Sequence, residues 1–269
     1  MALTITGSLG NDIIAPNNFV SGGTLPGITV DNNGVITTIT STDTTYDLSE
    51  DDNIDGGDGD DSINGGIGND TLSGGETGND TLNGGDGIDT ADYASGGEGA
   101  FTINLSTGTV TSTDPLDGAD TLISIENAIG GVLDDTIIGS IGDNFIEGGL
   151  GNDIIAGGAG NDTLDGDDQL GSAGESDTVD YSANIAAVNV NLATGIATST
   201  ESGTDTLDDF ANVYGGAGDD TLIGNSESNT FRGGAGNDLL DGGVGSEVDV
   251  ADYSTATVAV SVDLSSSSA

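Results

Sequence analysis

The chain lacks cysteine, histidine and lysine, and Arg232 is its single basic residue beside 47 acidic residues in a length of 269. Without cysteine no disulfide can form, and without thiols or imidazoles there is no Ser/His or Cys/His nucleophile pair. A formal charge of −46 leaves nothing to neutralise phosphates. Nucleic acid and bare anionic membrane surfaces are therefore excluded as partners, and cations are favoured.

Proline is scarce too, with three residues, which excludes collagen and polyproline linkers. No run approaches the roughly 18 apolar residues of a membrane-spanning helix. The opening stretch, MALTITGSLGNDIIA, has neither a positively charged segment nor a long apolar core. We therefore expect no membrane insertion and no conventional cleaved signal peptide.

The 48 glycines recur in a nine-residue pattern, GGxGxDxUx, in which U is a large aliphatic residue. Examples are GGIGNDTLS (65–73), GGLGNDIIA (148–156) and GGAGNDLLD (233–241), and a lone copy, GSLGNDIIA, lies at 7–15. One GGxGxD would be a weak signal, whereas tandem copies in one register are hard to obtain by chance. The repeat therefore opposes the disorder that high charge and few aromatic residues otherwise predict.

Three arrays of this repeat are separated by inserts. Each array ends in a D-x-[AV]-D-Y motif, and INLSTGTVTST (103–113) and VNLATGIATST (190–200) then read as β-hairpins around a Thr-Gly turn. A further hairpin, around Asn-Gly, is predicted in ITVDNNGVITTIT. We expect seven segments: a single repeat with a β-rich insert (1–47), an array (48–92), a hairpin insert (93–129), an array (130–179), a hairpin insert (180–214), an array (215–251) and a truncated insert with the C-terminal tail (252–269).

The repeat also predicts local structure. Its first six residues are turn chemistry, because glycine adopts positive φ without strain and Asn and Asp tolerate such geometry. Its last three form a short strand in which only the middle side chain, at position eight, points inward. Two repeats make one flattened coil, and stacked coils pair their strands in parallel. The predicted fold is all-β, with parallel β-roll or β-solenoid arrays interrupted by β-hairpin inserts.

Turns on the same edge of such a roll are two repeats apart. Asp61 is then expected to meet Asp80, and Asp70 to meet both Asp52 and Asp89. Stacked carboxylates repel each other unless a cation lies between them. With oxygen as the only ligand type, Ca²⁺ is favoured over Mg²⁺, because Ca²⁺ accepts about 6–8 oxygens in flexible geometry.

These residues resemble the RTX family, the hemolysin-type calcium-binding repeats that form a parallel β-roll. The resemblance implies that position-six side chains bind Ca²⁺ and that backbone carbonyls of the glycine turns complete each site. The implied side-chain ligands are Asp12, Asp52, Asp61, Asp70, Asp80, Asp89, Asp135, Asn144, Asp153, Asp162, Asp177, Asp220, Asn229, Asp238 and Asp249. The implied carbonyls belong to Gly57, Gly59, Gly66, Gly68, Gly75, Gly149, Gly151, Gly158, Gly160, Gly216, Gly218, Gly234 and Gly236.

Two of those positions depart from the pattern, because Asn144 and Asn229 replace the aspartate. A neutral amide oxygen still ligates but supplies less charge, so sites that use these turns are expected to be weaker or lost. Asp12, Asp52, Asp177 and Asp249 fit the repeat less closely than the other aspartates.

The resemblance also implies a function. Such proteins usually leave the cell by type I secretion with an uncleaved C-terminal signal, and fold when they meet extracellular calcium. No catalytic or lytic segment accompanies the repeats here, so we predict a secreted structural protein. Because the C-terminus stops within a hairpin pattern that the next chain's N-terminus would complete, head-to-tail assembly into a filament, matrix or surface layer is expected. The alternatives are a calcium-dependent adhesin that contacts glycan or a cell surface, and a repeat region of a larger exported protein.

An enzyme is the remaining alternative, since paired carboxylates also serve as the acid and base of glycosidases. Every candidate pair here is already explained by the repeat, so we predict that the chain is not an enzyme. Arg232 is expected to pair with a local acid on an outward strand position. The recurring Tyr93, Tyr181 and Tyr253 are expected to pack over the ends of the arrays.

Overall fold

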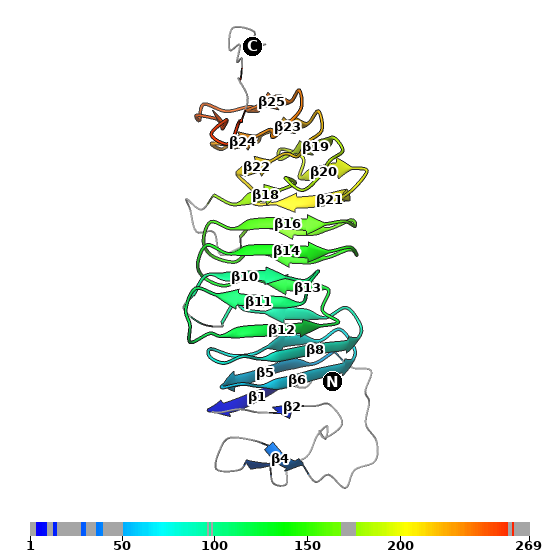
Figure 1. The fold of residues 1–269 in the computed structure, drawn as a ribbon, viewed down its shortest axis with the longest axis vertical. Helices are drawn as coiled ribbons and strands as arrows, with labels where there is room; N and C mark the ends of the chain where they lie inside the picture. The colour runs from blue at the N-terminus through cyan, green and yellow to red at the C-terminus, as the bar shows by residue number, and fades with distance from the viewer. Residues whose placement is uncertain are drawn as a thin grey trace.

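The computed structural model describes residues 51–95, 97, 99–167, 176–257 and 260, together with the backbone of 4–9, 13–14, 28–30 and 36–39. Strands are stacked along one long axis from β1 and β2 near the N-terminus to β25 and β26 near the C-terminus (Figure 1). The described residues contain no helix. In the described part of the chain, two sheets of 12 strands each form this stack, and a third sheet has two strands.

Sheet A contains, in spatial order, β1 (Thr4–Leu9), β5 (Asn53–Asp58), β7 (Thr71–Ser73), β9 (Thr90–Asp92), β13 (Asn127–Ile129), β15 (Phe145–Glu147), β17 (Thr163–Asp165), β21 (Gly203–Asp208), β20 (Ile196–Ser199), β19 (Val188–Asn191), β23 (Thr221–Ile223) and β25 (Leu239–Asp241). Sheet B contains β2 (Ile13–Ile14), β6 (Ser62–Ile67), β8 (Thr81–Asp86), β12 (Ala119–Ile123), β11 (Thr109–Ser112), β10 (Phe101–Asn104), β14 (Thr136–Ser140), β16 (Ile154–Gly158), β18 (Thr178–Asp180), β22 (Asn212–Tyr214), β24 (Thr230–Arg232) and β26 (Val250–Ala251). The small sheet joins β3 (Ile28–Val30) to β4 (Ile36–Ile39).

Successive repeats place their strands alternately in the two sheets. Within sheet A, Ile54 is in register with Leu72, and within sheet B, Ile63 is in register with Leu82, in parallel pairs. Two repeats therefore make one coil, as the sequence predicts. The all-β parallel roll is confirmed.

The core is a thin ladder between the sheets. Each repeat contributes one side chain at position eight, because only the middle residue of its short strand points inward. These residues are almost completely buried, and they include Ile54, Ile63, Leu72, Leu82, Ala91, Ile137, Ile146, Ile155, Leu164, Leu222 and Phe231.

The predicted hairpins join the two large sheets as additional strands. In the first insert β10 pairs with β11 in antiparallel fashion, and both lie in sheet B between β12 and β14. In the second, β19 pairs with β20 in sheet A, between β21 and β23. The β3–β4 pair confirms the hairpin expected around Asn-Gly. The division into seven segments stays a prediction.

The ladder yields a stability prediction. Replacing Ile155, which is 0 % exposed, by alanine removes packing at the centre of the roll and should lower the free energy of unfolding by about 2–5 kcal/mol. Ile141→Ala is the matched control, because that side chain is 89 % exposed, and its effect should stay within about 0.5 kcal/mol. Urea unfolding in saturating calcium measures both. Equal losses for the two variants would contradict the ladder.

Candidate functional site

The position-six side chains lie in the turns along the two edges of the roll. Edge 1 is the edge where the chain passes from sheet A to sheet B, and edge 2 is the edge where the chain passes from sheet B back to sheet A. Most of these polar side chains are buried, which is unusual for carboxylates. The buried members are Asp61, Asp70, Asp80, Asp89, Asp135, Asn144, Asp153, Asp162, Asp177, Asp220 and Asn229.

Neighbouring turns on one edge are joined by a recurring hydrogen bond. The backbone N–H of the position-six residue donates to the Oδ1 atom of its counterpart in the next coil. The bond from Asp61 to Asp80 measures 2.8 Å, as does that from Asp70 to Asp89. Asp52 donates to Asp70 in the same way, also at 2.8 Å. The pairings expected from the two-repeat coil are confirmed.

The result is a column of polar residues on each edge. The edge 1 column contains Asp61, Asp80, Asp120, Asp135, Asp153, Asp177, Asn229 and Asp249. The edge 2 column contains Asp52, Asp70, Asp89, Glu126, Asn144, Asp162, Asp205, Asp220 and Asp238. Asp238 is only partly buried and Asp249 is exposed, because they belong to the last coils described. The predicted ligand Asp12 lies outside the described residues.

The second carboxylate oxygen is the chemically informative atom. The Oδ2 atoms of Asp70, Asp89, Asp153 and Asp162 are buried and accept no hydrogen bond. Each lies against the first glycine of its own repeat, where a Cβ would collide with it. A buried carboxylate oxygen without a donor is costly. These atoms therefore need a positive partner inside the turn.

Glycine carbonyls border the same spaces. The carbonyl of Gly57 lies against the Cα of Gly75, whose φ is 108°, and a side chain there would strike that oxygen. Gly66 and Gly85 repeat this contact on the other edge. The glycines expected to supply carbonyls all lie in these stacked turns, and in the third array Gly216 and Gly218 face Gly234 and Gly236.

Burial raises the pKa of the column carboxyls. It is the main cause of the rise in the pKa of Asp80 and Asp153 to about 8, and of Asp70, Asp135 and Asp162 to about 6. The carboxylates of neighbouring coils raise these values further, while hydrogen bonds from backbone N–H groups lower them. Protons and cations therefore compete for the same oxygens.

The donor set fits Ca²⁺. No three acidic side chains of the described residues converge on one point, so an ion in a turn would take its remaining ligands from backbone carbonyls. Carboxylate and carbonyl oxygens suit Ca²⁺, which tolerates irregular shells of about 6–8 oxygens. Thiolate and imidazole ligands for softer metals are absent, since the chain has neither Cys nor His.

Sequence reasoning missed two aspartates in these columns. Asp120 and Asp205 are buried and accept hydrogen bonds from the N–H groups of Asp80 (2.8 Å) and Asp162 (3.0 Å). Both lie in the segments that return from a hairpin to the next array. The signal was present, because each begins an Asp-Thr-Leu tripeptide like that at Asp80. This signal was hidden because no glycine turn follows either tripeptide.

The recurring tyrosines do more than pack. Tyr93 and Tyr181 are buried, as expected, and the ring of Tyr93 packs at a tilt against that of Phe101, with ring centroids 4.9 Å apart. Their hydroxyls also donate to the Oδ2 atoms of Asp120 (2.9 Å) and Asp205 (2.8 Å). Tyr253, at the last coil described, is exposed.

Arg232 pairs locally, as the sequence predicts. Its guanidinium forms a 2.7 Å ion pair with Asp252 and lies 4.1 Å from the centroid of the Tyr214 ring. Hydrogen bonds from Ser254 and from Arg232 lower the pKa of Asp252 to about 2. This one pair leaves almost all of the negative charge of the chain uncompensated.

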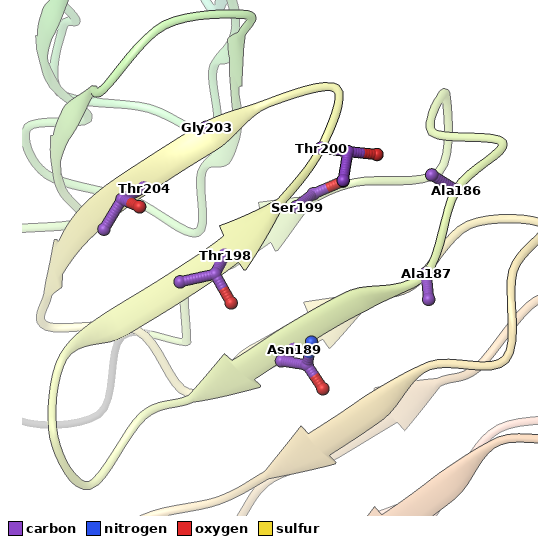
Figure 2. A pocket seen from close by; sticks show the side chains of 8 residues that line it. All are labelled: Ala186, Ala187, Asn189, Thr198, Ser199, Thr200, Gly203 and Thr204. Atoms are coloured by element: carbon purple, nitrogen blue, oxygen red, sulfur yellow. The ribbon is translucent and has the colours of Figure 1, made fainter.

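A shallow hollow lies on the outer face of the second hairpin. Figure 2 shows Asn189, Thr198 and Thr204 side by side across β19, β20 and β21. The hollow has a volume of about 580 Å³, and its lining contains neither a charged side chain nor an aromatic ring. It offers no acid–base pair and no aromatic platform for a sugar. Glycan contact stays a prediction.

Fold and geometry together define a parallel β-roll whose edges carry columns of buried oxygen ligands. The family model of the RTX calcium-binding nonapeptide repeat matches the chain four times, at residues 46–77, 75–91, 129–164 and 214–246. These segments are RTX repeats, and repeats of this family bind Ca²⁺. A search of curated proteins found no match. The described residues include no helix with the length and apolar character needed to cross a membrane.

The raised pKa values predict how the calcium-free roll responds to pH. Between the ordinary aspartate value of 3.8 and about 6–8, the folded columns hold protons that the unfolded chain releases. The roll without calcium should therefore lose stability as pH rises through this window. Circular dichroism in EDTA should show more strand at about pH 5 than at about pH 8. Strand content that increases with pH in EDTA would contradict the column geometry.

Proposed function

We propose that the chain is an exported structural protein whose roll is held together by Ca²⁺ in its edge columns. One observation carries this proposal: the buried Oδ2 atoms of Asp70, Asp89, Asp153 and Asp162 accept no hydrogen bond. Each points into a turn built from glycine carbonyls. A cation there satisfies the carboxylates of two coils at once and so joins the coils.

The energetics of the roll support a calcium requirement. One inward side chain per repeat buries little apolar surface, while the many glycines lose much conformational entropy on folding. The 47 acidic residues repel each other with one arginine to offset them. Ion binding therefore supplies a large share of the folding free energy.

A site outside the cell fits this requirement. Repeats of this family are typical of exported proteins, and extracellular calcium modules bind with dissociation constants of about 10⁻⁴–10⁻³ M. In a low-calcium cytosol the chain would remain unfolded and competent for export. We further propose that it acts through structure and binding, without catalysis, and that the seven segments of the sequence are its structural divisions.

Folding should depend on calcium specifically. Millimolar Ca²⁺ should convert a spectrum with little strand into one rich in strand, because ligand binding to the folded state alone shifts the equilibrium. Mg²⁺ at equal concentration is the control and should fail, since it demands stricter octahedral geometry. Circular dichroism with a calcium titration measures this. Equal strand content in EDTA and in calcium would refute the proposed function.

We also propose that copies of the chain stack head to tail. In each column a position-six N–H donates to the next coil, and a further coil would continue this pattern beyond Asp238 and Asp249. The last coils expose apolar side chains at Leu239, Val248 and Val250. Among the described residues, β25 and β26 are also the final strands of their sheets. Such strand edges are templates for pairing, and a contact that does not close extends indefinitely.

Electron microscopy tests this assembly. Filaments or layers should form in calcium and disperse in EDTA. Val250→Lys should block them, because a lysine on an edge strand opposes pairing, while leaving the calcium-induced strand signal intact. Ile141→Lys is the matched control, since it adds the same charge to a turn within the roll, and should assemble normally. Monomers alone in calcium would rule out assembly without affecting the calcium proposal.

A further inference from the structure

Asn144 and Asn229 occupy the columns differently from the aspartates. Both side chains are buried, at 4 % and 1 % exposure. In each, Oδ1 accepts the backbone N–H of a residue in its own turn, Ser140 at 2.7 Å and Asn225 at 3.0 Å. The Nδ2 group then donates to a backbone carbonyl of the coil below, that of Glu126 for Asn144 and that of Ala211 for Asn229. Both ends of each amide are therefore satisfied by protein.

The coil below each asparagine has a shortened turn. Leu122 and Ala128 are in register with Leu82 and Ala91, yet they are six residues apart where the earlier pair is nine apart. Leu207 and Val213, which are in register with Leu164 and Val179, are likewise six residues apart. The shortened turns contain Ser124 and Asp209, which have positive φ angles of 50° and 55°. The glycine loop that supplies carbonyls elsewhere is missing there.

These junctions occur at the hairpin inserts. β13 and β15 are neighbours in sheet A, whereas their sheet B partners β12 and β14 are separated by the two strands of the first hairpin. The second hairpin separates β21 from β23 in the same way, while β22 and β24 stay adjacent. Each asparagine therefore lies at a level where two extra strands separate neighbouring coils in one sheet and not in the other.

On the edge of the roll opposite each asparagine, a tyrosine hydroxyl supplies the hydrogen-bond donor. The hydroxyl of Tyr93 donates to Asp120 on edge 1, and that of Tyr181 donates to Asp205 on edge 2. The acceptor in both bonds is Oδ2, the atom that remains without a donor in Asp70, Asp89, Asp153 and Asp162. Each insert is thus flanked by one tyrosine and one asparagine that donate where a cation would otherwise lie.

We infer that the inserts interrupt both ion columns and that Asn144, Asn229, Tyr93 and Tyr181 close the interruptions as ion-free hydrogen-bonded junctions. The inference rests on the proposed calcium role of the intervening columns. An amide suits the junction because it presents an acceptor to its own turn and a donor to the carbonyl below. A carboxylate at this position would place its oxygen against the carbonyl oxygen of the coil below. The shortened turn has too few further carbonyls to hold an ion between these two oxygens.

Counting bound calcium tests the junctions. Asn144→Ala is compared with Asp162→Ala, because these residues are consecutive in the edge 2 column. In folded full-length protein at saturating calcium, equilibrium dialysis with elemental analysis should give the wild-type count for Asn144→Ala and at least one ion fewer for Asp162→Ala. The melting temperature of Asn144→Ala should fall by several degrees and should not recover at higher calcium.

Two further variants keep the inference testable should Asn144→Ala fail to fold. Asn144→Asp preserves shape but replaces the Nδ2 donor by a negatively charged acceptor, so its ion count should stay at the wild-type value while its melting temperature falls. Tyr93→Phe, which removes only a hydroxyl, should also melt lower. Loss of an ion in Asn144→Ala, or gain of one in Asn144→Asp, would overturn the inference. Failure of the wild-type chain to bind calcium would instead overturn the proposed function.

Discussion

The structure depends on one electrostatic constraint: buried carboxylates that face their own glycine turns must find a positive partner. Each turn on an edge lies directly against the next, so the charge of Asp89 raises the pKa of Asp70 and that of Asp135 raises the pKa of Asp153. Burial weakens screening by water and strengthens this repulsion. The same proximity lets a single cation satisfy two coils. Whatever neutralises the columns therefore also sets the spacing of the coils.

This constraint places the cohesion of the roll at its edges instead of its centre. The interior ladder contributes one side chain per repeat, such as Ile155 or Leu164. In an ordinary domain a broad apolar core supplies most of the driving force. Here the glycine turns, which would be the weakest part of such a domain, are the parts that we propose to bind ions. That exchange explains a composition rich in glycine and aspartate.

The repeat predicted the roll, the ladder and the pairing of Asp61 with Asp80, because a period of two repeats per coil fixes which turns meet. It failed at the inserts, where Asp120 and Asp205 enter the columns on the strands that return from the hairpins, without the glycine signature. The tyrosine hydroxyl bonds and the amide bonds of Asn144 depend on contacts between coils distant in sequence. Local pattern carries no information about such contacts. A search for the tripeptide Asp-Thr-Leu would have located Asp120 and Asp205, but it would have missed the tyrosine and asparagine contacts.

The inserts also obey a parity that follows from the alternation of strands. Each hairpin adds two strands to one sheet, about 9–10 Å of extra sheet length at the usual strand spacing, and a repeated addition on the same side would bend the stack progressively. The first hairpin lies in sheet B, and the strands from β12 to β18 begin and end in that sheet. The next hairpin therefore falls in sheet A, and both sheets reach 12 strands. The odd number of strands between the two described hairpins, β12 to β18, therefore places one hairpin in each sheet.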